Sequence, residues 1–341
     1  MLSVVLLMFK SYFKVMPKHR NTLQLLILFL TCVHCFSQSR TITVKDAVTN
    51  EALPFASINL LNGFGLYTNE IGQVNLAQET PNKIQISYVG YLNKIIFIDQ
   101  LTNDTVLLTP EENKLEEVEI IVSKKDRKIR KDFSVKPIIH DDINKMYWSA
   151  IGLQYAFFIP NSKENSRLHS ITIPVITKDL HQGITETTFE SDPYGTLVKI
   201  EFASVLDHLP HKKLYDYEKK VIIHAGRISE KITIPIEETI PIPEEGLFVT
   251  MTIMGKTNKK DVFQTELPYA FMNLHDRKKK IIKIILPNYP LVKAPKGVDT
   301  YFRNVFSNEV KWERISRPMV FKDQQEYPIY NIGIGYTFTG Y

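Results

Sequence analysis

The sequence predicts an all-β protein built of two antiparallel β-sandwich domains, the second larger and jelly-roll-like. Three observations predict this class. Short apolar–polar alternations with the two-residue period of a strand recur along the chain, and turn residues separate them at close spacing. Only one segment, near 141–149, favours a short helix. With 341 residues, 44% of them hydrophobic, the chain is long enough to bury cores of this size.

The first 38 residues have the order of a secretory signal peptide. Three basic residues precede the apolar run 23–30, and a less apolar stretch leads to a cleavage site near Gln38 and Ser39. The apolar run is too short to span a bilayer comfortably, so a cleaved leader is the preferred interpretation. We therefore expect an exported protein without an integral membrane span after cleavage.

Two other interpretations of this leader stay open. A retained anchor is favoured by the additional apolar run 4–9, and a lipoprotein would be acylated at Cys35. The start of translation is open between Met1 and Met16. Both cysteines of the chain, Cys32 and Cys35, lie in the leader, so the mature chain is expected to have no disulfide and no cysteine-based site.

The net charge of +5 also belongs mainly to the leader. Residues 1–38 contain four Lys and Arg and no acidic residue, which leaves 38 basic against 37 acidic residues in the rest of the chain. A nearly neutral body favours no nucleic-acid partner and no anionic surface.

The first sandwich is predicted over residues 39–110. About seven short strands follow one another without helical periodicity, and a tight turn at Gly72 separates two of them. The strand-like runs are 40–46, 55–60, 67–76 with its turn, 83–89, 94–98 and 105–108. Such closely spaced strands are typical of an antiparallel sandwich.

Four segments of this domain resemble a known family. They are 44–46 (VKD), 53–58 (LPFASI), 67–72 (YTNEIG) and 86–91 (ISYVGY), and in this order they are similar to the carboxypeptidase-like regulatory domain. The resemblance implies a small transthyretin-like sandwich, frequent in exported Bacteroidetes proteins and often placed ahead of TonB-dependent outer-membrane receptors. It implies no peptidase activity, because no histidine after the leader has the glutamate three residues on that a zinc carboxypeptidase needs.

Residues 111–135 are predicted to be a basic linker between the domains. The run 123–132 is dense in Lys and Arg and lacks interleaved aromatics, which is typical of a solvated linker and, as an alternative, of contact with anionic lipid or polysaccharide. Before it, residues 115–122 resemble the segment that follows this module in TonB-dependent receptors. A last strand on the sandwich edge is the preferred interpretation, and a remnant energy-coupling box is the alternative.

The second domain is predicted over 136–341. Its strand-like runs are 153–159, 167–176, 197–202, 221–224, 231–236, 247–253, 281–286 and 330–338. Segment 240–249 (IPIPEEGLFV) is similar to an uncharacterised sandwich region that accompanies this regulatory domain in other exported Bacteroidetes proteins. That resemblance implies no activity.

Few residues of this domain are candidates for a site. Tyr194, Tyr215 and Tyr217 are the candidate ligand-surface residues, because aromatic rings pack against sugars, although ordinary turn and surface roles are the preferred interpretation. The two tryptophans, Trp148 and Trp312, are predicted to lie in the core.

No catalytic, metal or cofactor residue is predicted. His208 and His211 lack a nearby third ligand, and the acidic pairs at 237–238 and 244–245 flank prolines in turn-rich sequence. No nucleophile elbow, phosphate-binding glycine loop or dinucleotide fingerprint occurs in the sequence.

These observations predict a non-enzymatic, exported binding or scaffold protein of the cell envelope, in the periplasm or at the outer membrane or cell surface. Its expected partner is a polysaccharide or an envelope protein, with no cofactor. The alternatives are a hydrolase that acts on glycan or peptide through the second domain, and an accessory module of TonB-dependent uptake.

Overall fold

The computed structural model describes residues 40–111, 130–140, 146–177, 195–224, 230–274, 277–293, 299–315 and 330–341. The leader, with Gln38 and Ser39, lies outside this set, as do Tyr194 and segment 115–122. The predicted all-β class is confirmed, because the regular elements described are strands apart from a 3₁₀ turn at Ile98–Gln100. In the part of the chain described, no helix is long and apolar enough to cross a membrane. Residues 40–341 form one compact unit.

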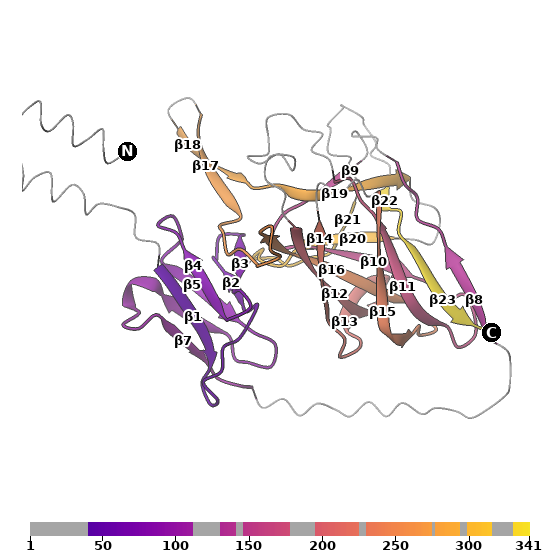
Figure 1. Cartoon of the computed structure of the whole chain (residues 1–341), viewed down its shortest axis with the longest axis horizontal. Coiled ribbons are helices and arrows are strands. Elements are labelled where there is room, and N and C mark those ends of the chain that lie inside the picture. The colour runs from indigo at the N-terminus through magenta and orange to yellow at the C-terminus, as the bar shows by residue number, and fades with distance from the viewer. Residues whose placement is uncertain are drawn as a thin grey trace, which may run out of the picture. The chain divides into compact units, whose positions relative to one another are not determined.

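The N-terminal sandwich, drawn in indigo and purple in Figure 1, consists of two small sheets. One has the order β4-β1-β7 and the other the order β3-β2-β5-β6. The pair β1·β7 is parallel, which differs from the predicted antiparallel arrangement, and the other pairs are antiparallel. The strands are β1 (Arg40–Asp46), β2 (Ser57–Asn59), β3 (Gly65–Tyr67), β4 (Gln73–Leu76), β5 (Lys83–Ser87), β6 (Lys94–Phe97) and β7 (Thr105–Leu108).

Alternation in the sequence explains the core of this sandwich. In β1, Ile42 and Val44 are fully buried while Thr43 between them is partly exposed. Gly72 adopts φ +70 in the predicted tight turn before β4, where its NH donates to the carbonyl of Asn69 at 3.0 Å. Glycine is needed here because a Cβ would also lie 2.8 Å from the carbonyl oxygen of Val44.

Asp46 ends β1 and organises the following turn. Its Oδ1 accepts hydrogen bonds from the backbone NH of Val48 at 2.6 Å and of Thr49 at 3.0 Å, and its Oδ2 accepts one from the Tyr91 hydroxyl at 2.6 Å. The Tyr91 bond and the two backbone bonds lower the pKa of Asp46. In return, the bond to Asp46 raises the pKa of Tyr91 to about 12.

The substitution Tyr91→Phe is therefore expected to destabilise the protein in a pH-dependent way. A carboxyl with a depressed pKa in the folded state contributes stability above its unfolded pKa, and this contribution is lost as the pH falls through its folded pKa. The melting temperature of Tyr91→Phe should lie below that of the wild type at neutral pH, and the gap should close below about pH 4. Thermal unfolding across this range measures the gap. Tyr88→Phe is the control, since the Tyr88 ring lies 5.4 Å from the Tyr91 ring, between centroids, but makes no bond to Asp46. If the melting temperature of Tyr91→Phe lay equally far below that of the wild type at all pH values, the pH-dependent role of the Tyr91–Asp46 hydrogen bond would be contradicted.

The larger sandwich contains β8 to β23. A seven-stranded sheet has the order β13-β12-β16-β10-β20-β21, with β14 also paired to β12. Opposite it lie the sheet β15-β11-β23-β8 and the three strands β22-β19-β9, while β17 and β18 form a separate hairpin. The strands are β8 (Lys131–Val135), β9 (Met146–Ser149), β10 (Leu153–Ile159), β11 (Arg167–Pro174), β12 (Gly195–Leu206), β13 (Leu209–Lys213), β14 (Lys219–His224), β15 (Lys231–Pro241), β16 (Leu247–Thr257), β17 (Tyr269–Leu274), β18 (Arg277–Ile282), β19 (Ile285–Lys293), β20 (Thr300–Asn304), β21 (Glu313–Arg314), β22 (Tyr330–Ile332) and β23 (Gly335–Gly340).

Two segments differ from the sequence-based expectation. Residues 146–149, predicted to belong to a short helix, form β9, because β19 pairs with them in antiparallel register. Residues 131–135, predicted to lie in the linker, form β8 on the edge of β23. The last two residues of the charged run, Lys131 and Asp132, therefore belong to a strand of the larger sandwich.

The core of the larger sandwich lies between its sheets. Alternate residues of β16, such as Val249 and Met251, face this core and are fully buried. The intervening Thr250 and Thr252 face outward yet are also buried: the Thr250 hydroxyl donates to the backbone carbonyl of Glu201 at 3.3 Å, and the Gln154 side chain donates to the Thr252 hydroxyl at 2.8 Å. The outer face of the seven-stranded sheet thus carries a layer of ordered side chains.

Phe306 joins the core of the larger sandwich to the N-terminal sandwich. Its ring is 1% exposed, and a Cβ added at Gly65 of β3 or at Gly152 before β10 would lie 2.2 or 2.4 Å from it. Tyr67 contacts it with a centroid distance of 5.5 Å. Nearby, Asn304 donates to the carbonyl of Gly63 at 2.9 Å. One aromatic ring therefore fills a slot to which both sandwiches contribute a glycine.

Candidate functional site

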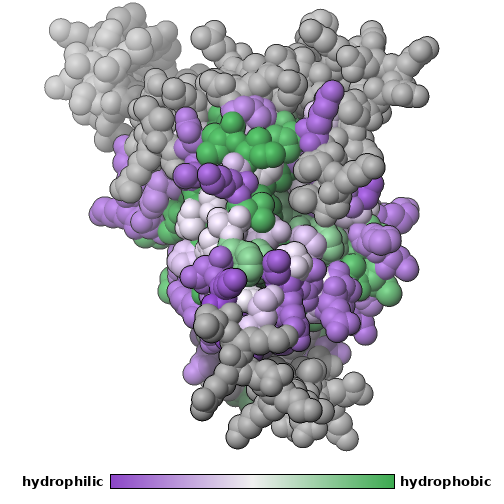
Figure 2. Space-filling model, turned by 90° about the vertical axis from the view of Figure 1, so that its right-hand side faces the viewer, coloured by the Kyte–Doolittle hydropathy of each residue, from purple (hydrophilic) through white to green (hydrophobic). Residues whose placement is uncertain are grey.

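An open depression of about 420 Å³ lies on the outer face of the β15-β11-β23-β8 sheet. Figure 2 views the molecule from the side where Figure 1 places β8 and β23, and it shows pale residues of intermediate hydropathy between charged and hydrophobic ones. The residues that line the depression come from β8, β11 and β23, and are Asp132, Phe133, Ser134, His169, Thr337, Phe338 and Thr339.

A β-bulge places the histidine in this depression. Against β23, the register of β11 shifts between Leu168 and Ser170, where two steps along β11 match one step along β23, so His169 is an additional residue on its strand. Against β15, the extra residues at this point lie on β15, between Pro235 and Ile240. As a result His169 and Ser170 are both partly exposed, between the fully buried Leu168 and Ile171. A strictly alternating strand would turn one of them into the core.

Hydrogen bonds between neighbouring strands order the polar side chains on this face of the sheet. We call His169, Ser170, Thr172 and their partners Thr339, Thr337 and Thr233 the hydroxyl face. The His169 Nε2 lies 2.9 Å from the Thr339 Oγ1, and the Ser170 Oγ lies 2.7 Å from the Thr337 Oγ1. On the other side of β11, the Thr172 and Thr233 hydroxyls are 3.0 Å apart. Each hydroxyl retains donor or acceptor capacity for a further partner, so the face is both pre-ordered and able to bind hydrogen-bonding ligands.

Aromatic and cationic groups flank the hydroxyl face. Phe133 and Phe338 are stacked with a centroid distance of 5.2 Å, and the Lys163 ammonium lies 5.1 Å from the Phe133 ring centre. Tyr341 follows Thr339 at the end of the chain, and its hydroxyl accepts a hydrogen bond from the Arg130 Nε at 3.2 Å. Two cationic side chains therefore contact residues of β8 and the chain end next to the depression, whose own lining includes the carboxylate of Asp132.

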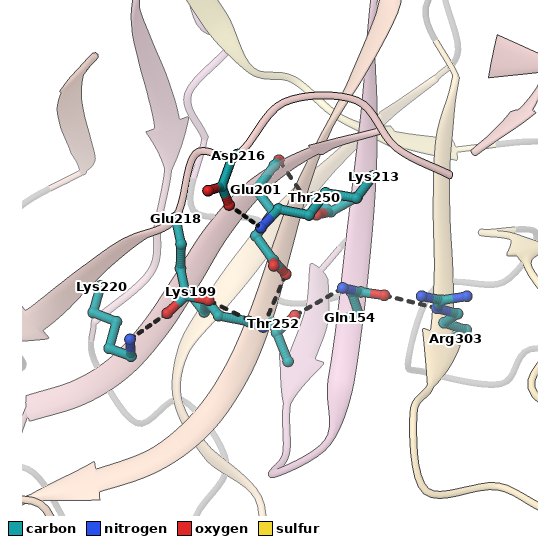
Figure 3. Close-up of polar contacts among 10 residues, drawn as sticks. All are labelled: Gln154, Lys199, Glu201, Lys213, Asp216, Glu218, Lys220, Thr250, Thr252 and Arg303. Atoms are coloured by element: carbon teal, nitrogen blue, oxygen red, sulfur yellow. Dashed lines mark hydrogen bonds and ion pairs between the residues drawn. The ribbon is translucent and has the colours of Figure 1, made fainter. Parts of the chain in front are cut away.

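A second polar surface lies on the outer face of the seven-stranded sheet (Figure 3). Lys199, Thr252, Gln154 and Arg303 are opposite one another in register on β12, β16, β10 and β20. We call these four residues the polar row. The Gln154 Nε2 donates to the Thr252 Oγ1 at 2.8 Å, and the Arg303 Nε donates to the Gln154 Oε1 at 2.7 Å.

Charges next to the polar row are largely paired. Lys199 forms ion pairs with Glu201 at 3.0 Å and with Glu218 at 3.7 Å, and Lys220 also bonds Glu218. Burial raises the pKa of Glu218, but the hydrogen bond from Lys220 and the charge of Lys199 outweigh it, so its pKa lies below the ordinary value. Burial lowers the pKa of Arg303, and the charge of Glu201 opposes that effect.

The predicted ligand-surface tyrosines lie elsewhere. Tyr217 is 8% exposed and packs on Phe202 at a centroid distance of 5.2 Å, which leaves little of its ring for a ligand. Tyr215 is half-buried, and its hydroxyl donates to the carbonyl of Pro241 at 2.8 Å. Burial raises the pKa of both hydroxyls. Tyr194 lies outside the described residues.

The described residues contain no group of three or more His, Cys, Asp or Glu side chains placed to hold a metal ion. His208 and His211 are exposed at the β12–β13 hairpin, and Glu237 pairs with Lys219 at 2.8 Å. No local sequence pattern indicated the hydroxyl face, because Ser170 and Thr337 are 167 residues apart. Trp312 is a clearer omission: predicted to be core, it is only partly buried and lies under the Arg303 guanidinium at 4.1 Å. Its charged sequence neighbours Lys311, Glu313 and Arg314 are the pattern that indicates a position near the surface.

Comparisons with known proteins assign no family. No family model matches the chain, and no curated protein does. A solved structure of the cysteine protease and lectin-like domains of Cwp84, a surface layer associated protein of Clostridium difficile, is similar over 89% of this chain and 59% of its own, with 12% identity and a TM-score of 0.29. This chain therefore spans less than two thirds of that structure's length.

The comparison corrects one prediction. The sequence was interpreted as that of a non-enzyme, whereas the matched structure includes a cysteine protease domain, so the non-enzymatic assignment is withdrawn. At 12% identity and a TM-score of 0.29, the likeness carries no argument for protease chemistry in this chain.

Proposed function

We propose that the protein is an exported cell-envelope protein whose larger sandwich binds a polysaccharide, with the depression on the hydroxyl face as the binding site. One observation carries the proposal: an open depression of about 420 Å³ is lined by a carboxylate, an imidazole and three hydroxyls of neighbouring strands. Sugar hydroxyls both donate and accept hydrogen bonds, and this set supplies both kinds of partner.

The geometry of a sheet supports an extended ligand. Strands lie about 4.8 Å apart, so hydroxyls on neighbouring strands recur at a regular spacing along a line that crosses the sheet. The pairs His169–Thr339, Ser170–Thr337 and Thr172–Thr233 continue such a surface from β23 to β15. Because the side chains already hold one another, little rotamer entropy remains to be lost on binding.

Export and the family of the first sandwich belong to the same proposal. The leader pattern of residues 1–38 supports export, and the four segments within residues 40–110 support membership of the carboxypeptidase-like regulatory domain family. A small sandwich of a three-stranded and a four-stranded sheet is compatible with that family. An envelope location would bring the larger sandwich into contact with polysaccharide.

Loss of the hydroxyl-face contacts is expected to weaken binding. The double variant His169→Ala, Thr339→Val removes one imidazole and one hydroxyl from the depression, and the dissociation constant should rise about tenfold or more. Affinity electrophoresis of the purified protein in gels that contain xylan, mannan, hydroxyethylcellulose or laminarin measures it. Thr105→Val is the matched control, an exposed strand threonine of the N-terminal sandwich. Equal mobility of all three proteins in every gel would refute the proposal.

A further inference from the structure

Arg303 is held in one orientation by two contacts on the outer face of the seven-stranded sheet. Its Nε donates to the Gln154 Oε1 at 2.7 Å, and Gln154 is itself anchored to Thr252 at 2.8 Å. The guanidinium carbon lies 4.1 Å from the centre of the Trp312 ring. Stacking on an indole and a bond at Nε together fix the plane of the guanidinium.

The charge of Arg303 has no direct ion-pair partner among the described residues, and Glu201 acts on it only from beyond ion-pair distance. No carboxylate there lies within ion-pair distance of it, and neither terminal nitrogen makes a hydrogen bond to a described residue. Its charged neighbours differ in this respect, since Lys199 pairs with Glu201 at 3.0 Å and Arg314 with Asp299 at 2.6 Å. In Figure 3 the only dashed line from Arg303 leads to Gln154.

Burial makes this unpaired charge costly. Arg303 is partly buried, and burial lowers its pKa. A partly desolvated guanidinium with a free pair of terminal N–H donors is stabilised most by an anion that accepts two parallel hydrogen bonds. A carboxylate has this geometry.

The surroundings favour a sugar over a peptide as the carrier of the carboxylate. β20 pairs with β10 along its length and with β21 at Tyr301 and Phe302, so most of the backbone of the strand that carries Arg303 is already occupied by sheet pairing and is not open to a peptide. The next positions on this face form an apolar cluster with three partly buried members, Phe158, Val205 and Trp312. The apolar face of a sugar ring packs against such side chains.

We propose that the Arg303 surface binds an acidic polysaccharide, with the two terminal N–H groups of Arg303 holding the carboxylate of a uronic acid and the neighbouring apolar cluster contacting its ring. The site lies on a different sheet from the hydroxyl face and is formed by different residues. It would therefore add selectivity for charged glycans to a protein that contacts neutral sugar elsewhere.

The test compares ligands that differ only in the carboxylate. Polygalacturonate and highly methyl-esterified pectin share the sugar, and esterification removes the charge. Affinity electrophoresis and isothermal titration of the wild-type protein should show binding to polygalacturonate that is about tenfold or more tighter than binding to the ester. Equal binding to both polymers, or binding to neither, would overturn the proposal.

Variants assign the effect to Arg303. Arg303→Gln should lose the preference for polygalacturonate, and Arg303→Lys, which keeps the charge but not the planar fork, should retain only part of it. Lys213→Gln is the matched control, since it removes one positive charge from an ion pair with Asp216. An equal loss in Lys213→Gln and Arg303→Gln would show non-specific attraction and refute the site.

Two further comparisons separate the possible outcomes. Dextran sulfate carries sulfate instead of carboxylate, and equally tight binding to it that Arg303→Gln abolishes would show a general anion site and contradict selectivity for a carboxylate. The double variant His169→Ala, Thr339→Val should keep its preference for polygalacturonate, so failure of the hydroxyl face and failure of the Arg303 surface are distinguishable. Thermal unfolding shows whether each variant is folded.

Discussion

Replacing Phe306 with alanine is expected to lower the free energy of unfolding by about 3–5 kcal/mol. The ring is 1% exposed and fills the slot between Gly65 and Gly152, whose backbones come so close that a Cβ on either would collide with it. Neither glycine has a side chain that can move into the vacated space. The cavity therefore persists, and the full cost of the lost contacts is paid.

Denaturant unfolding followed by fluorescence measures this loss. Phe302→Ala is the control, because Phe302 lies four residues earlier, has the same size and is only partly buried, with Tyr147 at a centroid distance of 5.1 Å. The free energy of unfolding should fall clearly less in Phe302→Ala than in Phe306→Ala. If Phe306→Ala cost no more than Phe302→Ala, the ring would not hold the slot as described.

Gly246→Ala is expected to cost about 2–4 kcal/mol. Gly246 closes the turn before β16, where its NH donates to the carbonyl of Pro243 at 2.9 Å with φ +85. Alanine is strained in this left-handed conformation. A Cβ would also lie 2.7 Å from the carbonyl oxygen of Ile159, which is backbone and cannot rotate away.

Gly63→Ala separates the two causes. Gly63 has nearly the same φ, +84, but a Cβ there would meet nothing within 4 Å. It should therefore show only the backbone strain, about 1 kcal/mol. Chemical denaturation of both variants gives the difference, and equal losses would exclude a steric contribution at Gly246.

Strand positions were predictable because burial of one face of a sheet leaves a local pattern. The alternation in 40–46 and 167–176 placed β1 and β11, and the glycine at 72 placed the turn before β4. Strand ends were less predictable. β12 has 12 residues and β16 has 11, longer than the runs 197–202 and 247–253, because partners on both sides continue the pairing beyond the apolar residues.

The candidate sites depend on pairings that no local pattern encodes. His169 reaches the depression only because a bulge interrupts β11, and it meets Thr339 from 170 residues further along the chain. Residues 146–149 were predicted as helical because their pairing with β19, more than 130 residues away, was not visible in the sequence. The polar row likewise draws one residue from each of four strands.

The slot around Phe306 bears on how this protein can be recombined. Domains that are shuffled as cassettes between host chains usually end in a polar surface that is complete on its own. Here Phe306 and Tyr67 pack together across the two sandwiches, and Asn304 bonds the backbone of Gly63. Excision of residues 40–110 would expose both rings to water. A chimaera that exchanges this sandwich for another must therefore exchange residues 304–306 with it, so that the unit of inheritance is larger than the sandwich itself.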